Sequence, residues 1–257
     1  MSFRLQAVGL VHANGHRALS PINLEVARGE RVVLIGPSGA GKTSLIRLAG
    51  ASLRPSEGQL DILGQNPWAI SSRGLRALRA RIGVVHQLAP IAPRSRLITA
   101  VLAGRLGQWS LARALISLLY PLDIPGARDA LARVGLAERL YDRCDRLSGG
   151  QLQRVGVARS LYQQADLLLA DEPVASLDPV SGEAVVRELV AESQQRGCTL
   201  VTALHAVDLA LRYFPRVIGM RAGSILFDLP AAEVTPAMLA RLYEGDADVS
   251  LPQALPA

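Results

Sequence analysis

Residues 36–43, Gly-Pro-Ser-Gly-Ala-Gly-Lys-Thr, carry the clearest chemistry in this chain. Their spacing is G-x-x-x-x-G-K-T, in which a glycine-rich loop curls its backbone N–H groups around phosphate oxygens and the lysine reaches the β- and γ-phosphates. The alternative is a plain glycine-rich turn between a strand and a helix. The residues that we predict to bind a nucleotide here are Gly36, Pro37, Ser38, Gly39, Ala40, Gly41, Lys42, Thr43 and Ser44.

Lys42 is the only lysine in the chain, and the other 27 of the 28 basic residues are arginine. A compact ammonium fits between two phosphates inside a tight loop, whereas a planar guanidinium does not. The Thr43 hydroxyl is a suitable ligand for the Mg²⁺ that accompanies a nucleotide triphosphate. The composition therefore favours a phosphate site over a simple turn.

A second group of polar residues follows a buried strand. Residues 167–170 are Leu-Leu-Leu-Ala, and Asp171 and Glu172 come directly after them. Ligands of α/β sheets bind at the carboxyl ends of the strands, so this is the edge where the phosphate loop also lies. Asp171 suits Mg²⁺, and Glu172 is then free to orient or deprotonate a water. The alternative is a pair of acids that cap a strand end.

Two further motifs have one functional and one structural interpretation each. Ser148, Gly149, Gly150 and Gln151 begin a helical pattern, where exposed N–H groups and the helix dipole can bind an anion, or where the serine is a plain N-cap. His205 follows the predicted strand 198–203, where it can hydrogen-bond a γ-phosphate or cap the helix at 206–212.

The elements that position these residues alternate between strands and helices. We predict strands at 3–10, 21–26, 31–35, 59–63 and 81–86, a helix at 44–49, and a hairpin at 217–228 before a helix near 235–243. His12 precedes the turn at 13–15 and either lies against an adenine or is an exposed loop histidine. Between 88 and 164 the pattern is helical, at 97–105, 111–119 and 127–134, which predicts an inserted helical subdomain.

The composition limits the function classes. No apolar run reaches the ~18–20 residues of a membrane span, and the first residues lack a signal-peptide pattern. The net charge is +6, but only 4% of the residues are aromatic and we read the arginines as scattered, so we expect no nucleic-acid partner. Cys144 and Cys198 have no metal-like spacing and are expected to be reduced thiols. Residues 246–257 have no periodicity and are expected to form a disordered tail.

Taken together, these motifs resemble the ATP-binding subunits of ABC transporters over residues 1–245. The phosphate loop, Gln87, the Leu-Ser-Gly-Gly-Gln element at 147–151, the acid pair, Asp178 and His205 occur in that family's order. The resemblance implies an α/β fold, with a P-loop NTPase core of RecA-like type, an antiparallel β subdomain and an inserted α-helical subdomain. A phosphate-loop kinase would leave residues 147–151 unexplained.

The resemblance also implies a mechanism. ATP and Mg²⁺ would lie between two copies of the chain arranged head to tail, with Ser148 of one copy covering the ATP that Lys42 of the other copy holds. Gln87 would sense Mg²⁺ and the attacking water, Asp178 would link the two sites, and His205 would hold the γ-phosphate. The family's usual adenine-stacking aromatic aligns near His12.

Within the family, the chain resembles ATPase subunits of phosphonate importers at residues 101–107, 170–179, 207–210 and 219–228. This implies a translocase on the cytoplasmic face of the cell membrane, with transmembrane permease subunits and a periplasmic or lipoprotein substrate-binding protein as partners. The solute itself does not follow from this chain. A soluble ABC-type ATPase that acts on nucleic acid is the rival interpretation, although the chain lacks a second ATPase unit and a coiled-coil insertion.

Overall fold

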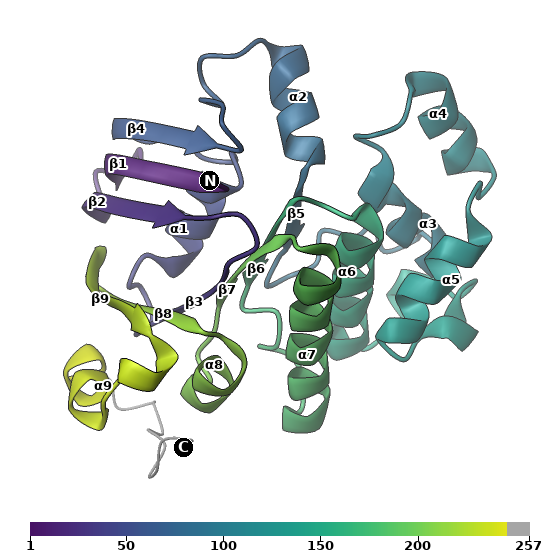
Figure 1. Cartoon of the computed structure of the whole chain (residues 1–257). Coiled ribbons are helices and arrows are strands. Elements are labelled where there is room, and N and C mark those ends of the chain that lie inside the picture. The colour runs from purple at the N-terminus through teal and green to yellow at the C-terminus, as the bar shows by residue number, and fades with distance from the viewer. Residues whose placement is uncertain (246–257) are drawn as a thin grey trace.

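The computed structural model describes residues 1–245, apart from the side chain of Leu118, so the predicted tail at 246–257 lies outside it. The larger of its sheets has six strands in the order β5-β6-β7-β3-β8-β9 (Figure 1). The first five of these are parallel and β9 is antiparallel to β8. The strands are β5 (Ile82–Val85), β6 (Leu167–Asp171), β7 (Thr199–Ala203), β3 (Arg31–Ile35), β8 (Arg216–Arg221) and β9 (Ser224–Pro230).

Both faces of this sheet are buried, which explains the unbroken apolar sequence of its strands. In β3, Val33 and Ile35 face one hydrophobic core, and Val32 and Leu34 face the other. The first core contains α6 (Gly149–Gln163), α7 (Pro179–Arg196) and α8 (Val207–Tyr213), and the second contains α1 (Lys42–Ala49). The sheet is therefore the middle layer that fixes where its strand ends lie.

A smaller antiparallel sheet covers the second core, in the order β2-β1-β4. Its strands are β1 (Phe3–Val11), β2 (Arg17–Val26) and β4 (Glu57–Ile62). They confirm the strands predicted at 3–10, 21–26 and 59–63 to within a few residues. Alternate residues of β1 such as Phe3 and Leu5 are buried against the core, as the alternating sequence pattern indicated.

The predicted helices between residues 88 and 164 are present, and none of the strands interrupts them. They are α3 (Leu97–Leu102) with the short 3-10 turn η1 (Ala103–Arg105), α4 (Leu111–Leu119) and α5 (Ile124–Arg133). Figure 1 shows these helices at the right of the molecule, beyond α6. The remaining helices are α2 (Ser72–Ala80) and α9 (Pro236–Leu242), with 3-10 turns at Ala137–Arg139, Cys144–Arg146 and Ala231–Glu233.

One arginine links two helices, and both cysteines are buried. Arg79 donates from its guanidinium to the backbone oxygen of Ala51 at 2.7 and 3.1 Å, which ties α2 to the end of α1. Cys144 and Cys198 are free thiols, as expected, and both are buried, which raises the pKa of each.

Candidate functional site

The phosphate loop runs from the carboxyl end of β3 to the N-terminus of α1. Gly36, Gly39 and Gly41 have φ values of 146°, 77° and 101°, which side chains rarely adopt. A Cβ on Gly36 would lie 2.0 Å from the Met220 oxygen, and one on Gly41 would lie 2.8 Å from the Ala18 oxygen. No atom lies within 4 Å of a Cβ built on Gly39. Gly36 and Gly41 must therefore be glycine because a side chain there would collide with the protein's own backbone. The sequence pattern did not reveal this reason.

Lys42 is 5% exposed and its ammonium lies inside the loop. Nζ donates to the backbone oxygens of Gly36 at 2.6 Å and of Pro37 at 3.0 Å. The Gly36 amide in turn donates to the hydroxyl of Tyr243, the residue just after α9, at 3.1 Å. Tyr243 therefore anchors the start of the loop from the far end of the described chain. Sequence reasoning missed this role, because the only local signal was a tyrosine at the end of a predicted helix.

Thr43 and Asp171 meet across the site. The Thr43 hydroxyl donates to Asp171 Oδ1 at 2.9 Å, and Asp171 is the last residue of β6. Burial raises the pKa of the Asp171 carboxyl, although the bond from Thr43 opposes this shift. A buried carboxylate beside a hydroxyl offers the hard oxygen ligands that Mg²⁺ prefers, so these two residues fit that ion. The arrangement places two of the three predicted metal ligands together, whereas the third, Gln87, donates to Glu172.

Glu172 is the centre of a cluster of polar side chains. Its Oε2 accepts a hydrogen bond from Gln87 Nε2 at 2.9 Å, and its Oε1 lies 2.6 Å from His205 Nε2. Glu172 follows β6, Gln87 lies two residues after β5, and His205 lies two residues after β7, so three adjacent parallel strands bring them together. The hydrogen bond with His205 lowers the pKa of Glu172, which keeps it ionised.

Glu172 also adopts an uncommon backbone conformation, with φ at 49°. A non-glycine residue in this region carries strain that the surrounding structure must hold in place. The conformation turns the chain as it leaves β6, and Glu172 Oε1 and Oε2 reach two different partners. Two adjacent acids therefore occupy different environments: Asp171 beside the hydroxyl of Thr43, and Glu172 among an amide and an imidazole.

A cleft opens in front of the phosphate loop, and its volume is about 210 Å³. His12, from the end of β1, lines it together with Glu172. His16 lines it too, with its ring stacked on that of His12 at a centroid distance of 6.3 Å, and sequence reasoning missed this residue. The loop residues that line the cleft are Ser38, Gly39, Ala40, Gly41, Lys42, Thr43 and Ser44.

Ser148 begins α6 as an N-cap. Its hydroxyl oxygen accepts from the Gln151 amide at 3.2 Å, and Gln151 Oε1 accepts from the Ser148 amide at 3.1 Å, which makes a reciprocal capping box. Arg139 Nη1 also donates to Gln151 Oε1, at 2.8 Å. Asp178 likewise caps α7, accepting from the Ser181 amide at 3.0 Å. Within one chain, Ser148 and Asp178 therefore act as helix N-caps. For Ser148 this is the structural alternative that the sequence left open.

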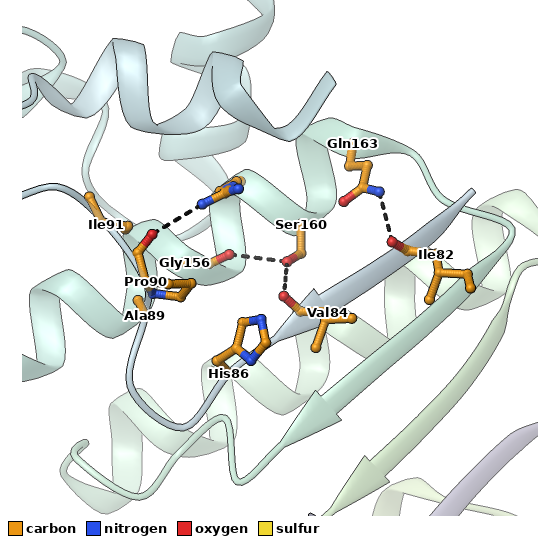
Figure 2. Close-up of a pocket in the computed structure, with 10 residues that line it drawn as sticks. Ile82, Val84, His86, Ala89, Pro90, Ile91, Gly156, Ser160 and Gln163 are labelled. Atoms are coloured by element: carbon orange, nitrogen blue, oxygen red, sulfur yellow. Dashed lines mark hydrogen bonds between the residues drawn. The ribbon is translucent and has the colours of Figure 1, made fainter. Parts of the chain in front are cut away.

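Beyond Gln87, a pocket of about 170 Å³ lies between β5 and α6 (Figure 2). Ala89 packs on α6 at Gly156, where an added Cβ would lie 2.9 Å from the Ala89 Cβ. Arg159 lines the pocket and donates a long hydrogen bond of 3.4 Å to the Pro90 oxygen. No carboxylate in the described part of the chain pairs with it, and its burial lowers its pKa. The segment after Gln87 thus forms one wall of a pocket that contains an uncompensated arginine.

Comparison with known proteins assigns the family. Residues 19–175 match the family model described as ABC transporter. The chain belongs to the ABC transporter family. It is accordingly an ATPase, and its nucleotide is ATP. The family also excludes the phosphate-loop kinase that the sequence had left as an alternative.

Similar curated members of the ABC transporter family cover almost the same length. The chain is 59% identical over 246 residues to "Phosphonates import ATP-binding protein PhnC 1" of Cupriavidus necator, covering 96% of this chain and 88% of the relative. It is 57% identical to the protein of the same name from Pseudomonas aeruginosa, covering 96% of this chain and 92% of the relative.

Solved structures of ABC cassettes have the same fold. A dimeric post-hydrolysis state of the cassette MJ0796 with ADP and Pi aligns with a TM-score of 0.77 and 27% identity, over 89% of this chain and 98% of that one. CbiO1 of Clostridium perfringens, part of the complex cbiONQ, aligns with a TM-score of 0.75 and 25% identity, over 94% of each chain. In this ABC ATPase, as far as the structure describes it, none of the helices has the length and apolar character to cross a membrane.

Proposed function

We propose that this chain is the ATP-hydrolysing subunit of an ABC importer for phosphonate or a related phosphorus compound. The observation that carries the chemistry is the Glu172 cluster, in which a carboxylate kept ionised at the sheet edge faces the cleft of the phosphate loop. The solute follows from the relatives, which are 57–59% identical over 96% of this chain and are named for phosphonate import.

In the proposed reaction, each side chain has a distinct part. Lys42 leaves the backbone oxygens of its loop to contact the β- and γ-phosphates, and the loop N–H groups hold the remaining oxygens. Glu172 accepts a proton from the attacking water, and Gln87 and His205 hold its two oxygens in place. His205 then also contacts the γ-phosphate.

Mg²⁺ would be held by Thr43 and Asp171, with Gln87 nearby. The fit rests on the two oxygen ligands that already lie 2.9 Å apart and on the burial of the carboxylate. When bound, the ion neutralises charge on the phosphate oxygens. His12 is proposed to lie against the adenine, because it lines the same cleft as the phosphate loop.

We also propose that residues 1–245 act as one ATP-binding domain with a helical subdomain at about 88–164. Two copies would bind head to tail, so that Ser148 and the following N–H groups of one copy cover the ATP of the other, and Asp178 lies between the two sites. Permease subunits would dock at the pocket beside Gln87, where Arg159 lacks an acidic partner. A substrate-binding protein outside the membrane would complete the importer, with this chain peripheral on the cytoplasmic face.

Reconstitution tests this function. The chain would be co-purified with its permease subunits and inserted into proteoliposomes that contain ATP, with a phosphonate-binding protein and a radiolabelled alkylphosphonate outside. ATP-dependent uptake is expected, and uptake of an unrelated solute such as an amino acid should be absent. A carrier that hydrolyses ATP but ignores phosphonates and phosphate esters would move the proposal to an ABC importer for another solute.

A soluble ATPase that acts on nucleic acid is the second candidate, because the chain carries a net charge of +6. A gel-shift titration at near-physiological salt separates the two, since a specific nucleic-acid protein retains affinity there and non-specific charge attraction is lost. We expect no shift at micromolar protein.

A further inference from the structure

The positive charge of this protein comes from one segment. Residues 62–122 contain eight arginines and no aspartate or glutamate, whereas the rest of the chain holds 20 basic and 22 acidic residues. The arginines are spread along the sequence, as predicted, but the acids are absent from this segment. Counting the arginines alone does not show this difference. The segment covers α2, β5, α3 and α4, together with the loop that contains Gln87.

Seven of these eight arginines have no carboxylate partner in the described part of the chain. Of the eight, Arg81 makes an ion pair, with Asp166, and none of the other seven pairs with a carboxylate within residues 1–245. Elsewhere in the described residues nine of the 19 arginines form ion pairs, such as Arg133 with Glu188 and Glu192. Cations without a carboxylate partner attract an anionic partner.

The helix α4 in this segment exposes large apolar side chains on its surface. Leu111, Leu115, Ile116 and Leu119 are 76%, 55%, 52% and 90% exposed, whereas Ser117 on the same helix is buried. Tyr120 and Leu122 extend this face just after the helix, at 69% and 42% exposed. Six of the eleven large exposed hydrophobic side chains in the described residues therefore lie within twelve positions.

The surroundings of α4 combine this apolar face with aromatic and basic side chains. Trp109 precedes the helix, and the Arg113 guanidinium lies over its ring at 4.8 Å. Figure 1 shows α4 and α2 rising to the same upper edge of the molecule, with α4 at its outer corner. A groove lined by α2 and by residues 103–107 connects the two parts of the basic segment.

We propose that α4 lies in the headgroup region of an anionic lipid bilayer, with its leucines in the outer acyl layer and the arginines of residues 62–122 that lack an acidic partner against lipid phosphates. A leucine-rich helix face with flanking Trp and Tyr and with basic rather than acidic neighbours is the composition of an interfacial helix. A protein partner would also accept the apolar face, but eight arginines without one acid match a uniformly anionic surface better than a mixed one. This second membrane contact would orient the ATPase beside its permease.

Vesicle flotation of the full-length protein tests the proposal, without ATP and without a permease. Binding is expected to vesicles of phosphatidylglycerol and phosphatidylcholine at 0.1 M salt, to weaken at 0.5 M salt, and to be far weaker with phosphatidylcholine alone. The double variant Leu115→Ser, Leu119→Ser should bind at least about tenfold more weakly. Leu226→Ser changes an exposed leucine on β9 and should bind like the natural protein.

Fluorescence locates the contact. The chain has two tryptophans, so in a Trp68→Phe background the emission reports Trp109 alone. Its spectrum should shift to the blue on anionic vesicles and be quenched by lipids brominated near the headgroup. Arg113→Gln is expected to weaken binding about fivefold, and Arg128→Gln, an exposed arginine on α5, should leave it unchanged.

Three results would overturn the proposal: no flotation with anionic vesicles at 0.1 M salt, flotation that the double leucine variant leaves unchanged, or burial of Trp109 only when the permease is present. The last result would show that protein covers the face instead of lipid. Unfolding temperature and basal ATPase activity should stay unchanged in the leucine variants and serve as controls for folding. The proposal rests on the proposed function only because it needs a membrane nearby. Since the vesicle assay uses no ATP, a negative result in it leaves the ATPase assignment intact.

Discussion

Replacing Glu172 by glutamine removes the proposed base and preserves almost everything else around it. The amide has the size of the carboxylate, and its two polar atoms can still meet Gln87 and His205. Its oxygen accepts from Gln87 Nε2, and its nitrogen donates to a neutral His205 ring. The backbone at φ 49° tolerates glutamine as it tolerates glutamate.

The structure allows the size of the effect to be estimated. General base catalysis contributes about 10²–10⁴ to a rate, so turnover should fall by that factor, which equals about 3–5 kcal/mol in the activation free energy. The folded state exchanges charge-assisted hydrogen bonds for neutral ones, which costs about 1 kcal/mol. Both hydrogen bonds of Glu172 can persist in the glutamine variant, so we expect only this small loss of unfolding free energy. A much larger loss would show that the substitution mainly destabilises the fold.

Three measurements on the same preparation test this reasoning. Steady-state phosphate release should drop as stated, the Kd for ATP should change less than about threefold, and size-exclusion chromatography with ATP and Mg²⁺ should show an accumulating dimer. The control is Glu183→Gln, a carboxylate on α7 that accepts from Tyr213 and Arg212 and does not line the nucleotide cleft. If the Glu172→Gln protein turned over ATP at the rate of the unsubstituted protein, the assignment of Glu172 as the base would be refuted.

Three further changes probe other parts of the structure. Lys42→Arg should weaken ATP binding at least about tenfold in a fluorescence titration, because Nζ is buried between two loop oxygens where a guanidinium does not fit. Gly36→Ala should lower the free energy of unfolding by about 3 kcal/mol and Gly39→Ala by only about 1 kcal/mol in urea titrations, because only the first Cβ meets backbone; equal losses would contradict this. Arg133→Met should cost about 3 kcal/mol by leaving Glu192 buried with only a 3.4 Å contact to Arg196, and a loss under 1 kcal/mol would show that this contact suffices.

Local patterns were enough to predict most of the strands and helices. The run at 31–35 has apolar side chains on both faces, and β3 is buried on both sides. Ser148 also caps a helix, α6, which is the structural alternative that its type suggested. These features depend on a few neighbouring residues, which is the information that a sequence contains directly.

Several features that depend on distant residues were not predictable. Tyr243 supports Gly36 from 207 positions away, and nothing near either residue indicates the contact. His16 shares the cleft with His12 because β1 and β2 pair as a hairpin, so the register of that pair decides which side chains face the phosphate loop. The meeting of Gln87, Glu172 and His205 could be expected only from the family resemblance, because the strand order β5-β6-β7 creates it.

The capping box at Ser148 explains how one serine can serve both a helix and a second copy of the chain. Its oxygen accepts from the Gln151 amide, so its hydroxyl proton remains available to donate outward. A Cβ built on Gly149 would have no atom within 4 Å, so the space beside the first N–H groups of α6 is open. Gln151 is fixed by Arg139, which holds the box in place. A cap that is complete within the chain and open toward solvent is therefore prepared to receive a phosphate, and in our proposal that phosphate is held by the other copy's Lys42.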